Sequence, residues 1–139
     1  MTTREDVRIK LTERIEALKL TWTDYPLVVE YDNAEAVNEA EQSTPYLSVR
    51  QVYMDGYQTS LSLNPTHRAL GTIILEARAK QGEGTARLNK LLEHFYPSVH
   101  MTDSMSPLRT FAARFGSSPA KLGWVGQAAL IPFWFDSAP

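Results

Sequence analysis

The segment Q-G-E-G-T at residues 81–85 has the composition of a turn that could bind an anion. Gly82 and Gly84 precede an amphipathic stretch, and exposed backbone N–H groups at the start of a helix attract negative charge. Basic residues that could assist are close in the sequence: Arg78, Lys80 and Arg87. Neither G-x-x-x-x-G-K-S/T nor G-x-G-x-x-G is present, which favours glycines that serve a tight reversal. A small anion- or nucleotide-binding domain built on this helix start is the alternative from a different functional class.

Patterns for metal binding and nucleophilic catalysis are missing from the sequence. The chain has no cysteine, and its histidines, His67, His94 and His100, are far apart and form no H-E-x-x-H pair. Ser117 and Ser118 lie in F-G-S-S-P, which is not the G-x-S-x-G nucleophile elbow, so we interpret them as turn residues. We expect no metal, no cofactor and no enzymatic activity, with the histidines on the surface or in loops.

Charge is unevenly distributed along the chain. Residues 32–45 contain acidic residues and no basic one, and the candidate contacts among them are Glu35, Glu39 and Glu41. The stretch 68–95 is mainly basic. Surfaces of opposite sign on one monomer suit a head-to-tail contact between copies, which closes into a ring when the rotation allows. Unconnected, solvated charges explain the same pattern equally well.

The C-terminal segment offers one candidate contact residue. Residues 124–135 alternate as a strand, which predicts that Ile131, Phe133 and Phe135 face the core and that Trp134 faces outward. Pro132 cannot donate to a ladder, so we expect this end at a sheet edge or a bulge. An exposed Trp on an edge strand is a reasonable contact for another chain.

Composition limits the functional classes. With 139 residues, of which 43% are hydrophobic and 22% charged, the chain has the size and composition of one globular domain, residues 1–139. A net charge of -2 argues against a protein whose main task is to bind nucleic acid phosphates. The longest apolar run, residues 128–135, is too short to span a membrane. We expect a soluble α+β domain with no membrane contact and no specific nucleic acid binding.

The elements that position these residues centre on residues 68–95. An alternating strand at 68–80 leads through the glycine turn into a helix at 85–95, with Thr85 placed as its cap. A capping box of Thr3 and Asp6, or of Thr2 and Glu5, opens a helix at 4–20. Asp55 and Gly56 predict a hairpin of strands 46–54 and 57–63. Further strands are expected at 27–31 and 108–115, a turn at 116–123, and mobile loops at 32–45 and at 98–106, which carries the candidate contact Asp103.

Several motifs in this order resemble a known family. They are E-Y-D-N after a short strand, P-Y-L-S-V, R-A-L-G-T-I-I-L-E with its G-E-G turn, L-N-K-L-L-E-H-F, and the closing L-G-W-V-G-Q-A-A-L-I-P-F-W-F-D. Together they span residues 26–136 and resemble the phage tail terminator proteins, relatives of minor tail protein U of lambdoid phages. The turn departs from the family pattern by beginning A-K-Q, and the connection at 33–44 is less aromatic and less rich in proline.

The resemblance implies both a fold and a role. The expected protomer is α+β, with a mixed, mainly antiparallel sheet of about five to six strands and two helices packed on it. Such proteins cap the finished tail tube as a hexameric ring, stop its polymerisation and join it to the head connector, although the isolated chain can stay monomeric. The expected partners are further copies, the major tail tube protein and the head–tail connector, with assembly in the bacterial host cytoplasm and a final location in the virion tail. A neck or head-completion protein is the near alternative.

Overall fold

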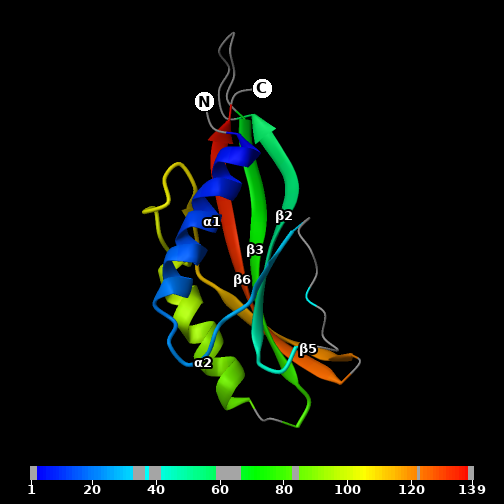
Figure 1. Cartoon of the computed structure of the whole chain (residues 1–139). Helices are drawn as coiled ribbons and strands as arrows, with labels where there is room; N and C mark the ends of the chain where they lie inside the picture. Colours follow the sequence, from blue (N-terminus) through cyan, green and yellow to red (C-terminus); the bar gives the residue numbers. More distant parts are fainter. Residues whose placement is uncertain are drawn as a thin grey trace.

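The protein, described from a computed structural model, is a sheet with two helices on one face (Figure 1). The structure describes residues 3–32, 37, 42–58, 67–82, 85–121 and 123–137. In this part of the chain the elements are α1 (Arg4–Leu20), β1 (Val29–Tyr31), β2 (Tyr46–Gln58), β3 (His67–Lys80), α2 (Ala86–Phe95), the 3-10 helix η1 (Tyr96–Ser98), β4 (Arg109–Thr110), β5 (Arg114–Lys121) and β6 (Trp124–Ser137). The α+β prediction is confirmed.

The sheet is mixed and mainly antiparallel. In the described residues it has six strands in the order β1-β2-β3-β6-β4, and β5 also pairs with β6. The short β1 is parallel to β2, while all other pairs are antiparallel. The long strands β2, β3 and β6 form the centre, and the described chain begins and ends near the same end of the molecule (Figure 1).

The N-terminal helix forms where the capping pattern predicts it. The Thr3 side chain accepts a hydrogen bond from the Asp6 N–H at 3.1 Å, and the Asp6 carboxylate accepts one from the Thr3 N–H at 2.9 Å. Both bonds satisfy N–H groups that lack partners inside the helix. Val7, Leu11 and Ile15 recur every fourth residue and are buried against the sheet.

The predicted strand-turn-helix unit is present, at 67–80 and 86–95. Alternate residues of β3, from Ile73 to Ala79, are fully buried, and they lie under the apolar stripe of α2. This stripe consists of Leu88, Leu91, Leu92 and Phe95. Gly82 has a φ of 96°, which favours glycine. Thr85 stands at the N-cap position, but its side chain makes no capping hydrogen bond because its backbone is already helical.

Gly71 marks a close approach at the middle of the sheet. A β-carbon there would lie 2.5 Å from the Val52 carbonyl oxygen and 2.6 Å from the Phe133 ring. The rings of Tyr53 and Phe133 instead meet edge to face, with their centroids 5.6 Å apart, on the strands that flank Gly71. The missing side chain therefore leaves room for the aromatic pair.

The predicted Asp-Gly hairpin is wrong. β2 continues through Asp55 and Gly56 to Gln58 and pairs with β3, and its register shifts between Met54 and Tyr57. The Asp-Gly pair therefore lies at a bulge, where the backbone freedom of glycine is as useful as it is in a turn. The pairing of β2 with β3 ends at Gln58 and His67, and most of the predicted second strand lies outside the described residues.

The C-terminal region also differs from the prediction. Residues 114–121, expected to be mainly a turn, form β5, while the expected strand 108–115 is broken into β4 and the start of β5. Pro132 lies in an interior strand and not at a sheet edge. Its carbonyl accepts a hydrogen bond from Phe111 N–H at 2.9 Å, so its nitrogen faces the break between β4 and β5, where no ladder bond is lost.

The loop at 98–106 is tied to the helices. Val99 and Met105 belong to the core, with 0% and 3% of their surface exposed. Arg14 of α1 donates to the Ser98 carbonyl at 2.8 Å and to the Ser104 hydroxyl at 2.9 Å. The expectation of a mobile loop at this position is therefore not supported, because its polar sequence contains two core anchors.

Candidate interaction surface

The face of the sheet that no described helix covers has an apolar centre. Side chains alternate along strands, so the even-numbered residues of β3, of β6 and of β2 up to Met54 point away from α1 and α2. The hydrophobic residues on this face, here called the open sheet face, that keep part of their surface exposed are Val52, Met54, Leu70, Ile74, Leu130, Pro132 and Trp134, whereas Tyr46, Trp124 and Ala128 on the same side are buried. Met54 is 61% exposed and Val52 46%. A sheet with one solvated face normally presents polar residues there, so this face has the character of a contact surface.

Trp134 lies on this face between two arginines. The Arg68 guanidinium carbon is 3.7 Å from the centroid of the Trp134 ring, and that of Arg109 is 5.3 Å from it. Arg68 is held by Asp136 through hydrogen bonds of 3.0 and 3.2 Å. The outward direction of Trp134 agrees with the prediction, but its position in the sheet and its exposure do not. The side chain is partly buried in an interior strand.

Arg78 and Lys80 project from the same face, near its other end. Arg78 forms an ion pair with Glu76 at 3.1 Å, and these side chains are only 15% and 17% exposed. Lys80 is exposed. The described basic residues of the face are Arg50, Arg68, Arg78, Lys80, Arg109 and Arg114, and the acidic ones are Glu30, Glu76 and Asp136. The open sheet face is therefore basic, although the chain as a whole has a net charge of -2.

The other predicted contact residues do not join this group. Arg87 lies at the start of α2, on the helix side, with its guanidinium carbon 5.3 Å from the centroid of the Tyr25 ring. Asp103 is exposed in the loop before β4. Glu35, Glu39 and Glu41 lie outside the described residues. Arg78 and Lys80 therefore lie on the open sheet face and Arg87 on the helix side.

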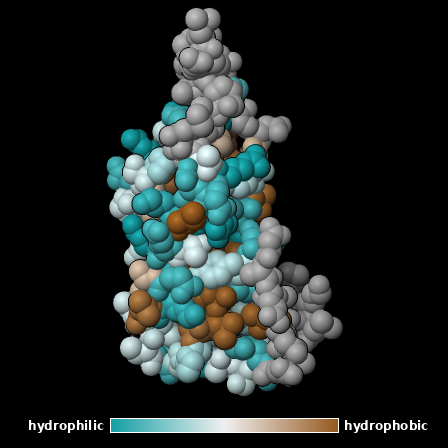
Figure 2. All heavy atoms as spheres, turned by 45° about the horizontal axis from the view of Figure 1, so that its top comes forward, coloured by the Kyte–Doolittle hydropathy of each residue, from teal (hydrophilic) through white to brown (hydrophobic). Residues whose placement is uncertain are grey.

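The helix side also exposes hydrophobic atoms. Figure 2 shows mainly hydrophilic side chains over the middle of the visible face and a gathering of hydrophobic ones lower down. Leu20, at the end of α1, is 86% exposed, and Val28, before β1, is 40% exposed. The molecule therefore presents apolar atoms on two different sides.

The histidines have structural contacts. His94 Nε2 lies 2.8 Å from the Thr21 hydroxyl and 2.9 Å from the Leu18 carbonyl oxygen, which connects α2 to the end of α1. His100 Nδ1 accepts from Ala113 N–H at 3.2 Å. His94 is thus a partly exposed helix residue that also joins the two helices. Across the described ranges, no three side chains of His, Cys, Asp or Glu gather as a metal site.

Sequence reasoning missed the apolar centre of the open sheet face. The sequence did contain a signal. The side of β3 that carries the polar residues Thr72 and Glu76 also carries the hydrophobic residues Leu70 and Ile74. Leu130 and Pro132 occupy the corresponding side of β6. Cross-strand pairing of 74 with 130 and of 72 with 132 brings these positions together, and that register was not evident from either segment alone.

Comparison with known proteins supports the fold alone. No protein-family model and no curated protein matches the chain. One solved structure, of a protein whose name describes no activity, is similar with a TM-score of 0.69 at 10% sequence identity. The similarity covers 100% of this chain and 99% of that one. The architecture therefore occurs elsewhere as a whole, with little sequence in common.

Among the helices that the structure describes, none combines the length and the apolar character required to cross a membrane.

Proposed function

We propose that this protein is a structural component of a virion, the tail terminator of a long-tailed phage or prophage. Copies of the chain form a hexameric ring on the finished tail tube, stop its polymerisation and present the other side of the ring to the head connector. The chain acts by shape and by contact with copies of itself and with neighbouring virion proteins. The role requires no catalysis.

The open sheet face is the observation that carries the proposal. It combines partly exposed hydrophobic side chains, the Arg68–Trp134–Arg109 stack and a basic rim on one surface. Large aromatic residues and arginines surrounded by apolar area are typical of protein interfaces. The order of motifs along the chain, which resembles tail terminators, supplies the specific role.

A closed ring requires two different surfaces on each copy, one for each neighbour. The open sheet face provides one of them. The exposed apolar atoms on the helix side, including those of Leu20, form the second, different surface. Weak ring contacts often need high concentration or a template, so the isolated protein is expected to be largely monomeric.

The test is a capping assay with the tail tube protein of the same phage genome. Tubes polymerised with this protein are expected to be shorter and to carry a ring at one end in negative-stain electron micrographs. Val52→Glu, which places a charge on the open sheet face, is expected to reduce ringed ends at least tenfold. Met101→Glu is the matched control, because Met101 is 69% exposed and lies in the loop after η1, away from the open sheet face.

Two results would count against the proposal. Tubes that grow equally long and bare in the presence of the protein contradict the terminator role. Binding to the connector but not to tubes favours the neck or head-completion role instead.

A further inference from the structure

The outer edge of β2 is only partly paired in the part of the chain that the structure describes. β1 pairs with Leu47–Val49 and stops, whereas β2 continues to Gln58. The Leu47 N–H donates across this edge to the Val28 carbonyl at 3.2 Å, and the Gln51 N–H donates to the Asp32 carboxylate at 2.8 Å. By the two-residue alternation of a strand, the Tyr53 N–H points to the same edge. Within the described residues no strand continues the pairing past Asp32.

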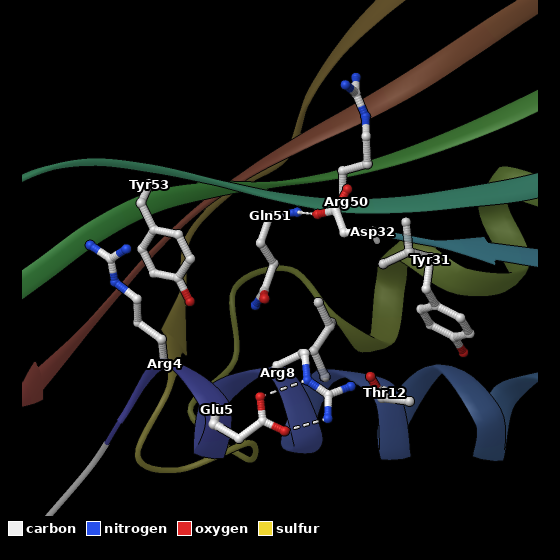
Figure 3. Close-up of a pocket in the computed structure, with 11 residues that line it drawn as sticks. Arg4, Glu5, Arg8, Thr12, Tyr31, Asp32, Arg50, Gln51 and Tyr53 are labelled. Carbon is white, nitrogen blue, oxygen red and sulfur yellow. Dashed lines mark hydrogen bonds and ion pairs between the residues drawn. The ribbon is translucent and has the colours of Figure 1, made fainter. Parts of the chain in front are cut away.

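A hollow of about 600 Å³ lies along this edge, between β2 and the first half of α1 (Figure 3). Its walls include Arg4, Arg8 and Thr12 from α1, and Gln51 and Tyr53 from β2. Both β2 side chains point across the hollow toward α1, while the Arg50 side chain points away from it. If β1 were longer, it would run along this edge of β2. The hollow therefore lies where a strand from another chain would be added.

Two hydrogen-bond donors beside the hollow are unused. Gln51 Nε2 and the Tyr53 hydroxyl are shielded from solvent and have no partner among the described residues. Burial raises the pKa of Tyr53, and the nearby Arg4 lowers it only in part, so the hydroxyl keeps its proton at neutral pH. Buried donors without acceptors destabilise the structure, and an acceptor brought by a partner would relieve that cost.

The charge of the hollow favours an acidic partner. The Arg4 guanidinium carbon lies 4.3 Å from the centroid of the Tyr53 ring, and Arg4 forms no ion pair in the described part of the chain. Arg8 is held by Glu5 at 2.9 Å, and Asp32 by the Gln51 N–H. The groups that remain to bind a partner are therefore the Arg4 cation and two neutral donors, Gln51 Nε2 and the Tyr53 hydroxyl.

We propose that the free edge of β2 binds an extended acidic segment of a partner protein chain. The segment adds as a strand beside Gln51–Tyr53 and places a carboxylate near Arg4, Gln51 Nε2 and the Tyr53 hydroxyl. Backbone hydrogen bonds supply affinity in this mode, and the side chain in the hollow supplies specificity. The site is separate from the open sheet face and does not depend on the capping role.

A titration of the isolated protein tests this inference. The probe is an acetylated octapeptide of alternating valine and glutamate, and the control has lysine in place of glutamate. Binding of the acidic peptide is expected to shift the backbone amide resonances of Gln51–Met54 and Arg4–Arg8 at low millimolar concentration. The affinity for the control peptide is expected to be at least tenfold lower. Absence of shifts, shifts confined to other regions, or equal binding of both peptides would overturn the inference.

Two variants sharpen the test. Gln51→Leu removes a donor at similar size, and Arg4→Gln removes the cation, so each is expected to weaken binding at least fivefold. Lys10→Gln, on an exposed position of α1 away from the hollow, is the control and is expected to bind normally. Trp134→Ala, on the open sheet face, is also expected to retain peptide binding, which separates this site from the ring contact. Unchanged binding by both Gln51→Leu and Arg4→Gln, with normal melting temperatures, contradicts the inference.

Discussion

The two faces of the sheet differ in what covers them more than in what they are made of. On the covered face, Ile73, Ile131 and Phe133 are at most 2% exposed beneath the helices. Their chain neighbours Ile74, Leu130 and Trp134 point the other way and remain partly exposed. Hydrophobic composition alone therefore does not decide which side of a strand becomes core.

The comparison shows why the open sheet face suits a contact between proteins. Both helices lie on the same face, so the apolar centre of the other face has no described cover (Figure 1). Arg68 and Arg109 lie over the Trp134 ring on that face, and arginine stems cover apolar surface while their charged groups remain in water. The covered face should control stability, and the open face should control assembly.

The largest difference is expected between adjacent isoleucines on opposite faces. Ile73→Ala removes a fully buried side chain and is expected to lower the free energy of unfolding by about 2–5 kcal/mol. Ile74→Ala, one residue along on the open sheet face, is expected to cost about 1 kcal/mol, because part of its surface is already in water. Urea unfolding of both variants checks the difference, and equal losses would show that the faces are wrongly distinguished.

The next effect concerns the close approach at Gly71. Gly71→Ala forces a β-carbon against the Val52 carbonyl and the Phe133 ring and is expected to destabilise the protein by about 1–3 kcal/mol. Gly116→Ala is the control, since a β-carbon there has nothing within 4 Å. Thermal unfolding measures both. A Gly71→Ala protein as stable as its parent would mean that the aromatic pair moves aside at no cost.

A smaller effect on stability is expected on the open sheet face. Trp134→Ala loses two cation–π contacts and is expected to cost about 1–2 kcal/mol. Its main consequence should be weaker self-association at high concentration, measured by sedimentation velocity. A variant that melts much earlier yet associates normally would reverse the roles assigned to the two faces.

The smallest effect is a pH dependence on the helix side. Burial and the hydrogen bond to Glu16 raise the pKa of Tyr31 above the ordinary value of 10.0. The folded state thus holds this proton more tightly than the unfolded state, and its contribution to stability is complete below about pH 10 and lost above it. Unfolding at pH 8 and pH 10.5 should show a smaller alkaline loss for Tyr31→Phe. An identical loss in both proteins would remove Tyr31 as its source.

The sequence predicted the elements whose signals are local. The capping box at Thr3 and the apolar stripe from Leu88 to Phe95 each specify a helix through neighbouring residues, and both helices form within one residue of the expected bounds. The alternation of β3 likewise identified its buried side. These signals require no knowledge of distant parts of the chain.

The features that depend on pairing between distant segments were not predictable in this way. Asp55–Gly56 suits a turn or a bulge equally, and only the register with β3 makes it a bulge. Pro132 suggested a sheet edge or a bulge, and only the pairing of β6 with β4 and β5 shows that it lies opposite the break between those two strands. Strand alternation predicted that Trp134 faces outward, whereas the stacking of Arg68 and Arg109 on Trp134 required the complete sheet.

The most direct test of the central claim compares two exposed methionines by oxidative footprinting. Met54 lies on the open sheet face and is 61% exposed, whereas Met101 lies in the loop after η1 and is 69% exposed. Both should oxidise at similar rates in the free protein, as measured by mass spectrometry. In rings on tail tubes, Met54 is expected to oxidise at least fivefold more slowly because a neighbouring chain covers it. Unchanged oxidation of Met54 in the assembled state would contradict the claim that the open sheet face makes the contact.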